Sequence, residues 1–499
     1  MIRLFEFFPG ALSWTTLFLV VFLSWQKPVW AAIFIILFDV YWLCKSIYLS
    51  FHLRSTFQKM REVMRINYRE RIDIFANWKS IHHLVILPMA TEQYEVVRES
   101  FQSLARSNYP KEKLLLVLAI EERAGKEAEA TAERIMKEFS LTSNPGGGQA
   151  SIFPHILTTV HPADLPNEIP GKGSNESWSA KEAKEKIIDK LGISHENVLV
   201  SVFDVDTQIY PEYFGCLTYN FLTAEHPQRS SYQPIPLFTN NIYQAPALAR
   251  VISFSATFWQ MMQQSRPERL TTFSSHAMPL KALIEIGYWQ KDIVSEDSRI
   301  FWQCYLHYSG DWRVIPLFYA VSMDANVAPT FWGTMANLYK QQRRWAWGAE
   351  NVPYMFEGFR KNKAIPLKSK LYWAFHGTEG FHSWATNSLI IFALGWLPVV
   401  IGTGDFNSSI LSYNLPNITR WIMSLASLGI VSSAILSVML LPPKPEGIRF
   451  RHYALYLLQW ALMPITLIAF GAFPALEAQT RLMLGGKYKL GFWITPKNR

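Results

Sequence analysis

The chain has few cysteines and few charged residues for its length. Only three of its 499 residues are cysteine, and these three lie far apart with no paired ligand spacing. This scarcity argues against a disulfide framework and a cysteine-based zinc site, and it fits a soluble domain in a reducing cytosol. Charged residues make up 17% of the chain, whereas hydrophobic residues make up 49%. That balance indicates a membrane protein with a sizeable soluble part.

Several common functional motifs are also missing. The glycine run in Leu141 to Ala150 lacks the spacing of a phosphate-cradling loop and predicts a flexible surface turn. No Ser/His/Asp arrangement is present for nucleophilic catalysis. The net charge of +9 comes with no nucleic-acid-binding motif. Much of the basic excess lies at membrane boundaries, so we expect membrane lipids and no nucleic acid as partners.

Apolar segments lie at both ends of the chain. Ala11 to Trp25 and Val29 to Ser50 predict a helical hairpin through the bilayer, and no small-residue cleavage site marks the first as a signal peptide. The C-terminal part contains three further candidate spans, which are His382 to Gly402, Ile418 to Leu441 and Tyr453 to Ala475. We therefore expect a hairpin at residues 1–51, a soluble domain at 52–370, and interfacial and membrane helices with a short tail at 371–499.

Basic residues at the membrane boundaries predict the orientation. Arginines and lysines crowd the boundaries after the second span and before the third, which places the soluble domain in the cytosol. The loop Thr403 to Thr419 contains Asp405 and no basic residue, as expected outside. A fully crossing last span would put the basic tail outside, unless Pro464 and Pro474 break it into a re-entrant or hairpin segment. Leu371 to Trp384 is a candidate interfacial helix, so the number of crossings stays open.

The soluble part alternates strands and helices. Apolar runs at His82 to Pro88, Leu114 to Ile120 and His155 to Val160 predict strands, and helical patterns follow the first two. This alternation predicts an α/β domain with a mostly parallel sheet. Glu121 and Glu122 end the second strand.

Two carboxylates end another apolar run. The stretch Val198 to Thr207 is an apolar run of strand length that ends in Asp204 and Asp206. Open α/β sheets bind ligands at the carboxyl ends of their strands. Two aspartates there predict a hard, oxygen-ligand site for a divalent cation, typically one that carries a diphosphate. An Asp-x-Asp triplet also arises often by chance, so alone it is a weak signal.

Two polar turns are further candidates. Lys172 and the small residues up to Asn175 precede a predicted helix from Glu176, where they would bind an anion or form a plain loop. Ser275 and His276 lie in a polar turn, where a substrate contact and a structural role are both open.

Two helical segments complete the set of candidates. Ser295 is a candidate N-cap, and Glu296 and Asp297 would lie in the first turn of the helix. A purely structural role at the start of the helix would therefore account for all three residues. Two arginines and two tryptophans in Tyr339 to Gly348 would form either an interfacial belt or a diphosphate clamp with a sugar-stacking platform.

The order of these motifs resembles a known family. Asp-Val-Asp at 204–206, Ser-Glu-Asp at 295–297 and Gln-Gln-Arg-Arg-Trp at 341–345 are similar to the Asp-x-Asp, Thr/Ser-Glu-Asp and Gln-x-x-Arg-Trp motifs of membrane-embedded family 2 glycosyltransferases. This group contains cellulose, mannan and hyaluronan synthases. The resemblance covers roughly Leu84 to Gly348 plus the flanking spans. It implies a GT-A-like cytosolic domain with a mostly parallel sheet between N-terminal and C-terminal transmembrane helices.

The resemblance also implies roles for residues. Asp204 and Asp206 would hold Mg²⁺ or Mn²⁺ on the diphosphate of a UDP- or GDP-sugar. Asp297, with Glu296 beside it, would be the base that deprotonates the acceptor, and an inverting displacement needs no enzyme nucleophile. Other implied donor contacts are Glu121 or Glu122, Lys172, Asn175, Asp204, Gln341 and Arg344. The expected acceptor contacts are Ser275, His276 and Trp345.

Some family features are absent. No Arg-rich motif with Asp-x-Ser-x-x-Gly is present, so no cyclic-dinucleotide-binding domain is expected. The tail from Phe492 to Lys497 resembles an ending that is cytosolic in some relatives. The expected function is polysaccharide synthesis at the plasma membrane, with a single transfer to a membrane lipid as the alternative. A non-catalytic transporter or scaffold is a third hypothesis, although the spans carry few charges besides Asp39.

Overall fold

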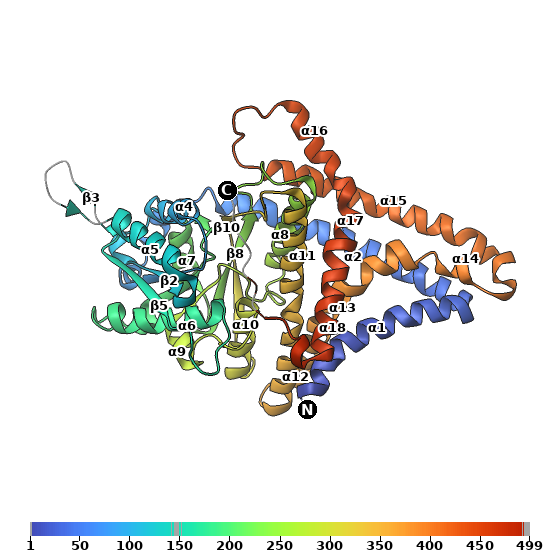
Figure 1. Cartoon of the computed structure of the whole chain (residues 1–499), viewed down its shortest axis with the longest axis horizontal. Helices are drawn as coiled ribbons and strands as arrows, with labels where there is room; N and C mark the ends of the chain where they lie inside the picture. The colour runs from blue at the N-terminus through green and yellow to red at the C-terminus, as the bar shows by residue number, and fades with distance from the viewer. Residues whose placement is uncertain (1, 141, 144–148, 151, 492, 494–499) are drawn as a thin grey trace.

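The computed structural model describes residues 2–140, 142–143, 149–150, 152–491 and 493 of the chain. Residues 141 and 144–148 of the predicted glycine-rich turn, and most of the tail motif, lie outside these residues. The described part consists of an α/β domain and a group of long helices that project from one side of it (Figure 1).

A mostly parallel sheet forms the centre of the α/β domain. Its strand order is β5-β2-β1-β6-β9-β8-β10-β7, and within it β1 pairs in parallel with β2 and β6, β2 with β5, and β8 with β10, while β9 and β7 run antiparallel to their neighbours. The strands are β1 (His82–Met89), β2 (Leu114–Glu121), β5 (His155–His161), β6 (Val198–Val202), β7 (Gln208–Ile209), β8 (Ser230–Phe238), β9 (Ala277–Pro279) and β10 (Arg313–Met323). A short separate pair joins β3 (Thr142–Ser143) and β4 (Gln149–Ala150).

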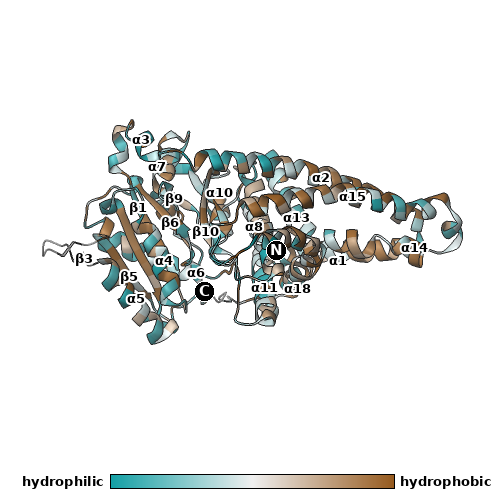
Figure 2. Ribbon diagram, turned by 90° about the horizontal axis from the view of Figure 1, so that it is seen from above, coloured by the Kyte–Doolittle hydropathy of each residue, from teal (hydrophilic) through white to brown (hydrophobic). Residues whose placement is uncertain are grey.

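Helices cover both faces of the sheet. One face packs against α4 (Tyr94–Ala105), α5 (Gly125–Ser140) and α7 (Tyr213–Thr223), and the other against α6 (Lys172–Ala183), α9 (Leu280–Glu285) and α10 (Glu296–His307). Within β1, Val85 and Leu87 face the first group while Leu84 and Ile86 face the second. Strands that are buried on both faces read as continuous apolar runs, which is why they were predictable. Figure 2 shows this apolar character along β1 and β5.

Four helical segments are long and apolar enough to cross a membrane. They are α1 (Ile2–Gln26), α2 (Pro28–Val63), α15 (Ile410–Met439) and the continuous segment Phe450–Leu484. These segments indicate a membrane protein. The first helix includes the residues before Ala11, which lengthens the short predicted stretch. Because α15 begins at Ile410, the predicted outer loop is shorter than expected.

The predicted span His382 to Gly402 is not among these four. The chain there forms α13 (Leu367–Leu389), a π-helical turn η8 (Ile390–Leu394) and α14 (Leu397–Ile401), with a turn at Gly395 and Trp396 between them. The polar residues of α13 lower its hydropathy, and the turn divides the apolar part. The predicted interfacial helix Leu371 to Trp384 lies within α13.

The last helical segment is continuous. It comprises α16 (Phe450–Leu458), η10 (Gln459–Leu462), α17 (Met463–Leu467), η11 (Ile468–Ala472) and α18 (Phe473–Leu484). Pro464 and Pro474 lie in the first turns of α17 and α18, where a missing N–H is tolerated, so no hairpin forms. Figure 1 shows α17 and α18 running across the base of the bundle formed by α1, α2 and α15.

Other helices join the α/β domain to this bundle. These are α3 (Tyr68–Ile72), α8 (Ala247–Gln264), α11 (Phe331–Ala346) and α12 (Asn351–Lys361). A shared apolar core connects Phe57 of α2, Leu237 of β8, Phe258 of α8 and Leu436 of α15. This core fixes the sheet's position relative to the bundle.

Candidate active site

A buried lysine lies at the centre of four acidic side chains. Lys172 Nζ is 3.0 Å from both carboxylate oxygens of Asp297 and 3.1 Å from Asp204 Oδ1. It is also 3.4 Å from Glu176 Oε1 and 3.7 Å from Glu296 Oε1. Burial alone would lower the pKa of Lys172, but the surrounding carboxylates raise this pKa well above its ordinary value. The lysine is therefore an ammonium cation.

A close helix contact places this lysine. Lys172 was predicted in a loop, but it is the first residue of α6. An ideal Cβ on Gly173 would lie 2.8 Å from Gln290 O and 3.1 Å from Glu296 Cβ. Only glycine permits α6 to approach the start of α10 this closely. The Asn175 side chain donates to Ala119 O of β2 at 2.9 Å, which anchors α6 to the sheet.

Glu176 was not predicted from the sequence. It follows Lys172 by four residues on α6, so both side chains lie on one helix face. Glu176 is fully buried, and burial raises the pKa of its carboxyl well above the usual range. Its Oε1 is at ion-pair distance from Lys172 but without hydrogen-bond geometry. A glutamate inside a predicted helix is too common in sequences to be recognised as a site residue.

Glu296 and Asp297 begin α10. The Ser295 side chain does not cap this helix as predicted, because its Oγ donates to Glu350 Oε1 at 2.6 Å. Burial, and then the neighbouring Asp297 carboxylate, raise the pKa of Glu296 to about 8. Asp297 is 22% exposed, so its carboxylate is partly accessible to solvent. One oxygen each from Glu176, Glu296 and Asp297 lie within 4.8 Å of one another, a spacing suited to a metal ion, but Lys172 already supplies a positive charge there.

His276 lies beside the proposed base. Its Nδ1 donates to Phe273 O at 3.1 Å and is 3.7 Å from Asp297 Oδ1. Burial lowers the pKa of His276, so the imidazole is neutral at pH 7. Because Nδ1 carries the proton, Nε2 is an acceptor, and it has no hydrogen-bond partner among the described residues. Ser275 precedes it with φ of +67°, a left-handed conformation that is strained for serine.

The two aspartates after β6 point in different directions. Asp204 Oδ2 accepts a hydrogen bond from Ser274 Oγ at 2.8 Å, and its Oδ1 faces Lys172. Asp206 is fully buried, and its Oδ2 accepts from Asp324 N at 2.9 Å. The Asp-x-Asp pair is thus divided between the lysine cluster and a second acidic residue.

The predicted acids at the end of β2 lie farther along the sheet, because β1 separates β2 from β6. Glu121 pairs with Arg123. Burial raises the pKa of Glu121, and the Arg123 guanidinium opposes this rise. Glu122 Oε2 accepts from Ala163 N at 3.0 Å.

Helix α11 carries the last group of predicted residues. Gln341 is buried, and its Oε1 accepts from Asn326 Nδ2 at 3.4 Å. The charge of Arg344 acts to lower the pKa of Glu296, so the guanidinium is near the carboxylate cluster. The Trp345 ring lies 5.9 Å from Phe238 and 6.0 Å from Phe273.

Helix α18 holds α11 in place. Glu477 accepts hydrogen bonds from Arg343 Nη1 at 2.6 Å and from the Tyr339 hydroxyl at 2.9 Å. The crossing segment at the base of the bundle therefore braces the helix that carries the Gln-x-x-Arg-Trp residues.

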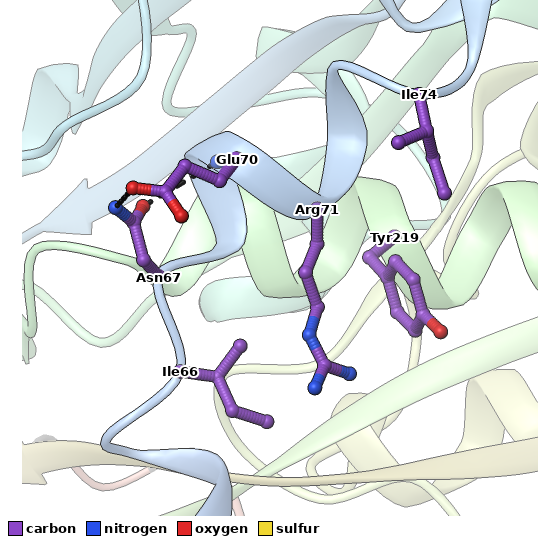
Figure 3. Close-up of a pocket in the computed structure, with 6 residues that line it drawn as sticks. All are labelled: Ile66, Asn67, Glu70, Arg71, Ile74 and Tyr219. Atoms are coloured by element: carbon purple, nitrogen blue, oxygen red, sulfur yellow. Dashed lines mark hydrogen bonds between the residues drawn. The ribbon is translucent and has the colours of Figure 1, made fainter.

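A depression of about 490 Å³ lies elsewhere, on the surface of α3 and α7 (Figure 3). In it, Asn67 and Glu70 bond to each other, and Arg71 lies near the Tyr219 ring. No predicted site residue lines this depression. The candidate site is instead the cluster around Lys172.

The chain was compared with known protein families, curated proteins and solved structures. The model of a family described as glycosyl transferase family group 2 matches residues 199–473. A comparison with curated proteins found no match. Among solved structures, the chain is similar to mannosyltransferase PcManGT from Pyrobaculum calidifontis in complex with GDP-Man and Mn²⁺, at 12% identity and a TM-score of 0.39, with 84% of this chain and 99% of that chain covered. It is also similar to S. aureus TarS 1–349 in complex with UDP-GlcNAc, at 11% identity and a TM-score of 0.36, with 71% and 90% covered.

Proposed function

Because the chain belongs to glycosyl transferase family group 2, we propose that it is an inverting glycosyltransferase that moves a sugar from a UDP- or GDP-sugar to an acceptor at the membrane. Within this family we propose a relation to the cellulose synthase-like and hyaluronan synthase-like enzymes. The α/β domain, residues 52–370, would carry the reaction on the cytosolic side of the plasma membrane.

One observation carries the proposal. Lys172 Nζ is within ion-pair distance of both Asp204, the expected donor-side acid, and Asp297, the expected acceptor-side base. A single buried ammonium therefore connects the two halves that a displacement at an anomeric carbon requires. This arrangement supports transfer chemistry more than it supports a scaffold, because burying so many ionisable groups is unfavourable without a functional need.

Asp297 is the proposed base. Its carboxylate takes the acceptor hydroxyl proton while the acceptor oxygen bonds to the anomeric carbon, and the nucleoside diphosphate leaves with the electrons of the broken bond. Lys172 has to leave Asp297 before this carboxylate can accept a proton. The negative diphosphate offers the ammonium a new partner, so donor binding and activation of the base would be coupled. Arg344 supplies further positive charge to the departing diphosphate.

The residues after β6 fit a divalent cation. Asp206 is a buried carboxylate that contacts Asp324, and two residues later Asn326 has a buried Oδ1 that accepts no hydrogen bond among the described residues. Oxygen donors of this kind suit Mg²⁺ or Mn²⁺. Asp206, the second acid of the Asp-x-Asp pair, would hold the ion, which would neutralise charge on the diphosphate.

The acceptor is a growing glycan in the function we favour, with polysaccharide as the product. Trp345 is half-buried beside Phe238 and Phe273, and such aromatic faces stack on sugar rings. A membrane lipid acceptor is the second candidate, because α11 contacts α18 where the domain meets the bundle. His276 Nε2, as an unpartnered acceptor, would bind an acceptor hydroxyl in either case.

A donor screen tests this function. The detergent-solubilised protein is incubated with labelled UDP- and GDP-sugars, with Mg²⁺, Mn²⁺ or a chelator, and both nucleoside diphosphate release and labelled product are measured. We expect turnover with one class of donor and products of increasing length. A single glycolipid product would favour the lipid acceptor, and absence of turnover with every donor would contradict the proposal.

A further inference from the structure

We infer that Asp324 is a ligand of the divalent cation, and that the ion is held between Asp206 and Asp324, with Asp204 assigned to Lys172. This inference rests on the proposed function and adds a residue that no sequence motif indicated. It changes which part of the sheet edge holds the metal.

Asp324 lies at the carboxyl end of β10, as Asp206 lies just beyond the end of β6. The two strands are parallel in the sheet, so their ends meet at one edge. Asp324 N donates to Asp206 Oδ2 at 2.9 Å, which brings the two acidic residues into direct contact. Asn240, just after β8, donates to both Asp206 O at 3.0 Å and Asp324 Oδ1 at 3.1 Å. Three strand ends thus converge on these two residues.

The contacts of Ala325 hold the segment after β10 in place. Ala325 exchanges two hydrogen bonds with the Asn241 side chain, at 2.7 Å and 3.0 Å, and its methyl group packs in the apolar core shared with the bundle. Asp324 and Asn326 flank Ala325, and their side chains contact polar groups outside this apolar core. Asp324 Oδ1 accepts from Asn240 Nδ2, and Asn326 Nδ2 donates to Gln341 Oε1.

Asn326 provides an independent sign of a ligand. Its side chain is 5% exposed, and its Nδ2 bonds to Gln341. Its Oδ1, in contrast, is buried and accepts no hydrogen bond within the described residues. Buried amide oxygens without a partner are rare in folded proteins. A cation held by two carboxylates beside this oxygen would satisfy it, because Mg²⁺ and Mn²⁺ prefer oxygen ligands.

Asp204 is held elsewhere. Its two oxygens face Lys172 and Ser274. The turn at Val205 and Asp206, with Val205 buried in the core, directs the two aspartates apart. Asp204 therefore belongs to the lysine cluster, and Asp206 is left to bind the cation.

Manganese binding to the full-length, detergent-solubilised protein tests this assignment. Free Mn²⁺ is measured by electron paramagnetic resonance for the wild type and for Asp206→Asn, Asp324→Asn, Asp204→Asn and the distal control Asp405→Asn. We expect Asp206→Asn and Asp324→Asn to weaken Mn²⁺ binding at least about tenfold. Asp204→Asn and Asp405→Asn should each stay within about twofold of the wild type, since neither residue is a ligand in this assignment.

The asparagine at 324 keeps the backbone N–H and an Oδ1 acceptor, so the contacts with Asp206 and Asn240 survive and the fold should persist. Wild-type Mn²⁺ affinity in Asp324→Asn, together with loss in Asp206→Asn, would overturn the inference while leaving the transferase proposal intact. If Asp324→Asn is poorly folded by thermal melting, Asn326→Asp tests the same site, because an added carboxylate should tighten Mn²⁺ binding. Unchanged affinity in that variant would also overturn the inference. Failure of the proposed function would instead appear as absence of turnover in the wild-type donor screen.

Discussion

Glu296 is a buried acid whose ionisation is opposed by its surroundings. Burial and the adjacent Asp297 carboxylate raise the pKa of Glu296 to about 8, so the folded protein keeps this carboxyl neutral at pH 7. In the unfolded chain the same group ionises near its ordinary value of about 4.3. The folded state therefore binds more protons than the unfolded state between these two values, and stability falls as pH rises through that range.

Replacing Glu296 with glutamine should reduce this pH dependence. Between pH 6 and pH 9 the wild type should lose melting temperature, and Glu296→Gln should lose less, because its amide stays neutral. Thermal melting in detergent measures the difference, with the exposed Glu62→Gln as control. An identical loss in the wild type and Glu296→Gln would show that Glu296 is already ionised at pH 6.

The sequence alone identifies Asp204, Asp297 and Arg344 as candidates, because each belongs to a short motif and the motifs occur in the order that is typical of the family. Glu176 and Asp324 carry no such signal. Each is a single acid in an ordinary local context, and its importance depends on which helix or strand end packs beside it. The central place of Lys172 likewise depends on a tertiary contact and was out of reach of the sequence.

At the scale of elements, the contact of α6 with α10 organises the site. The predicted loop at Lys172 to Asn175 is instead the first turn of α6, since the packing of Gly173 against Gln290 and Glu296 favours the helix there. The local sequence pattern could not predict this helical turn, because the contact joins residues that are far apart in the sequence.

Gly173→Ala should separate these helices. The added methyl group would meet Gln290 O at 2.8 Å, and overpacking of this kind costs about 1–3 kcal/mol. We expect lower melting temperature and reduced transfer. Gly380→Ala in α13 is the matched control, because its Cβ would meet no atom within 4 Å. Equal melting temperatures and equal transfer rates in the two variants would show that the close approach of α6 to α10 is not needed.

The strands of the sheet were largely predictable, but the shortest elements were not. β1 and β2 are apolar runs buried on both faces, and the predicted bounds of β1, β2 and β5 agree with the structure within one residue. β7 and β9 have two and three residues and pair antiparallel, so they carry no periodic signal. A turn at Gly395 and Trp396 divides the predicted span His382 to Gly402, and hydropathy alone does not reveal this turn.

At the scale of the whole molecule, contacts at the two ends of the bundle indicate its orientation. At the far end, Thr403 Oγ1 donates to Trp25 O at 3.1 Å, so the turn after α1 meets the loop before α15. At the near end, Lys489 Nζ donates to Glu6 Oε1 at 2.6 Å, which holds the tail beside the start of the chain. With α17 and α18 lying across the base, the chain up to Lys489 stays on the side of the α/β domain (Figure 1).

Cysteine labelling in intact cells tests this topology. Asp405→Cys, Lys444→Cys and Lys489→Cys are made in a Cys44→Ser background, since Cys216 and Cys304 are buried. A membrane-impermeant thiol reagent should label only position 405, and positions 444 and 489 should react after permeabilisation. Labelling of position 489 in intact cells would mean that the last segment crosses the membrane.

The most direct test of the central claim is donor binding and sugar transfer measured side by side in Asp297→Asn, with the exposed Asp292→Asn as control. Loss of a general base lowers the rate by about 10²–10⁴-fold, whereas donor affinity should change little. We predict that Asp297→Asn binds the nucleotide-sugar and forms almost no product, while Asp292→Asn behaves as the wild type. Wild-type turnover in Asp297→Asn would contradict the account.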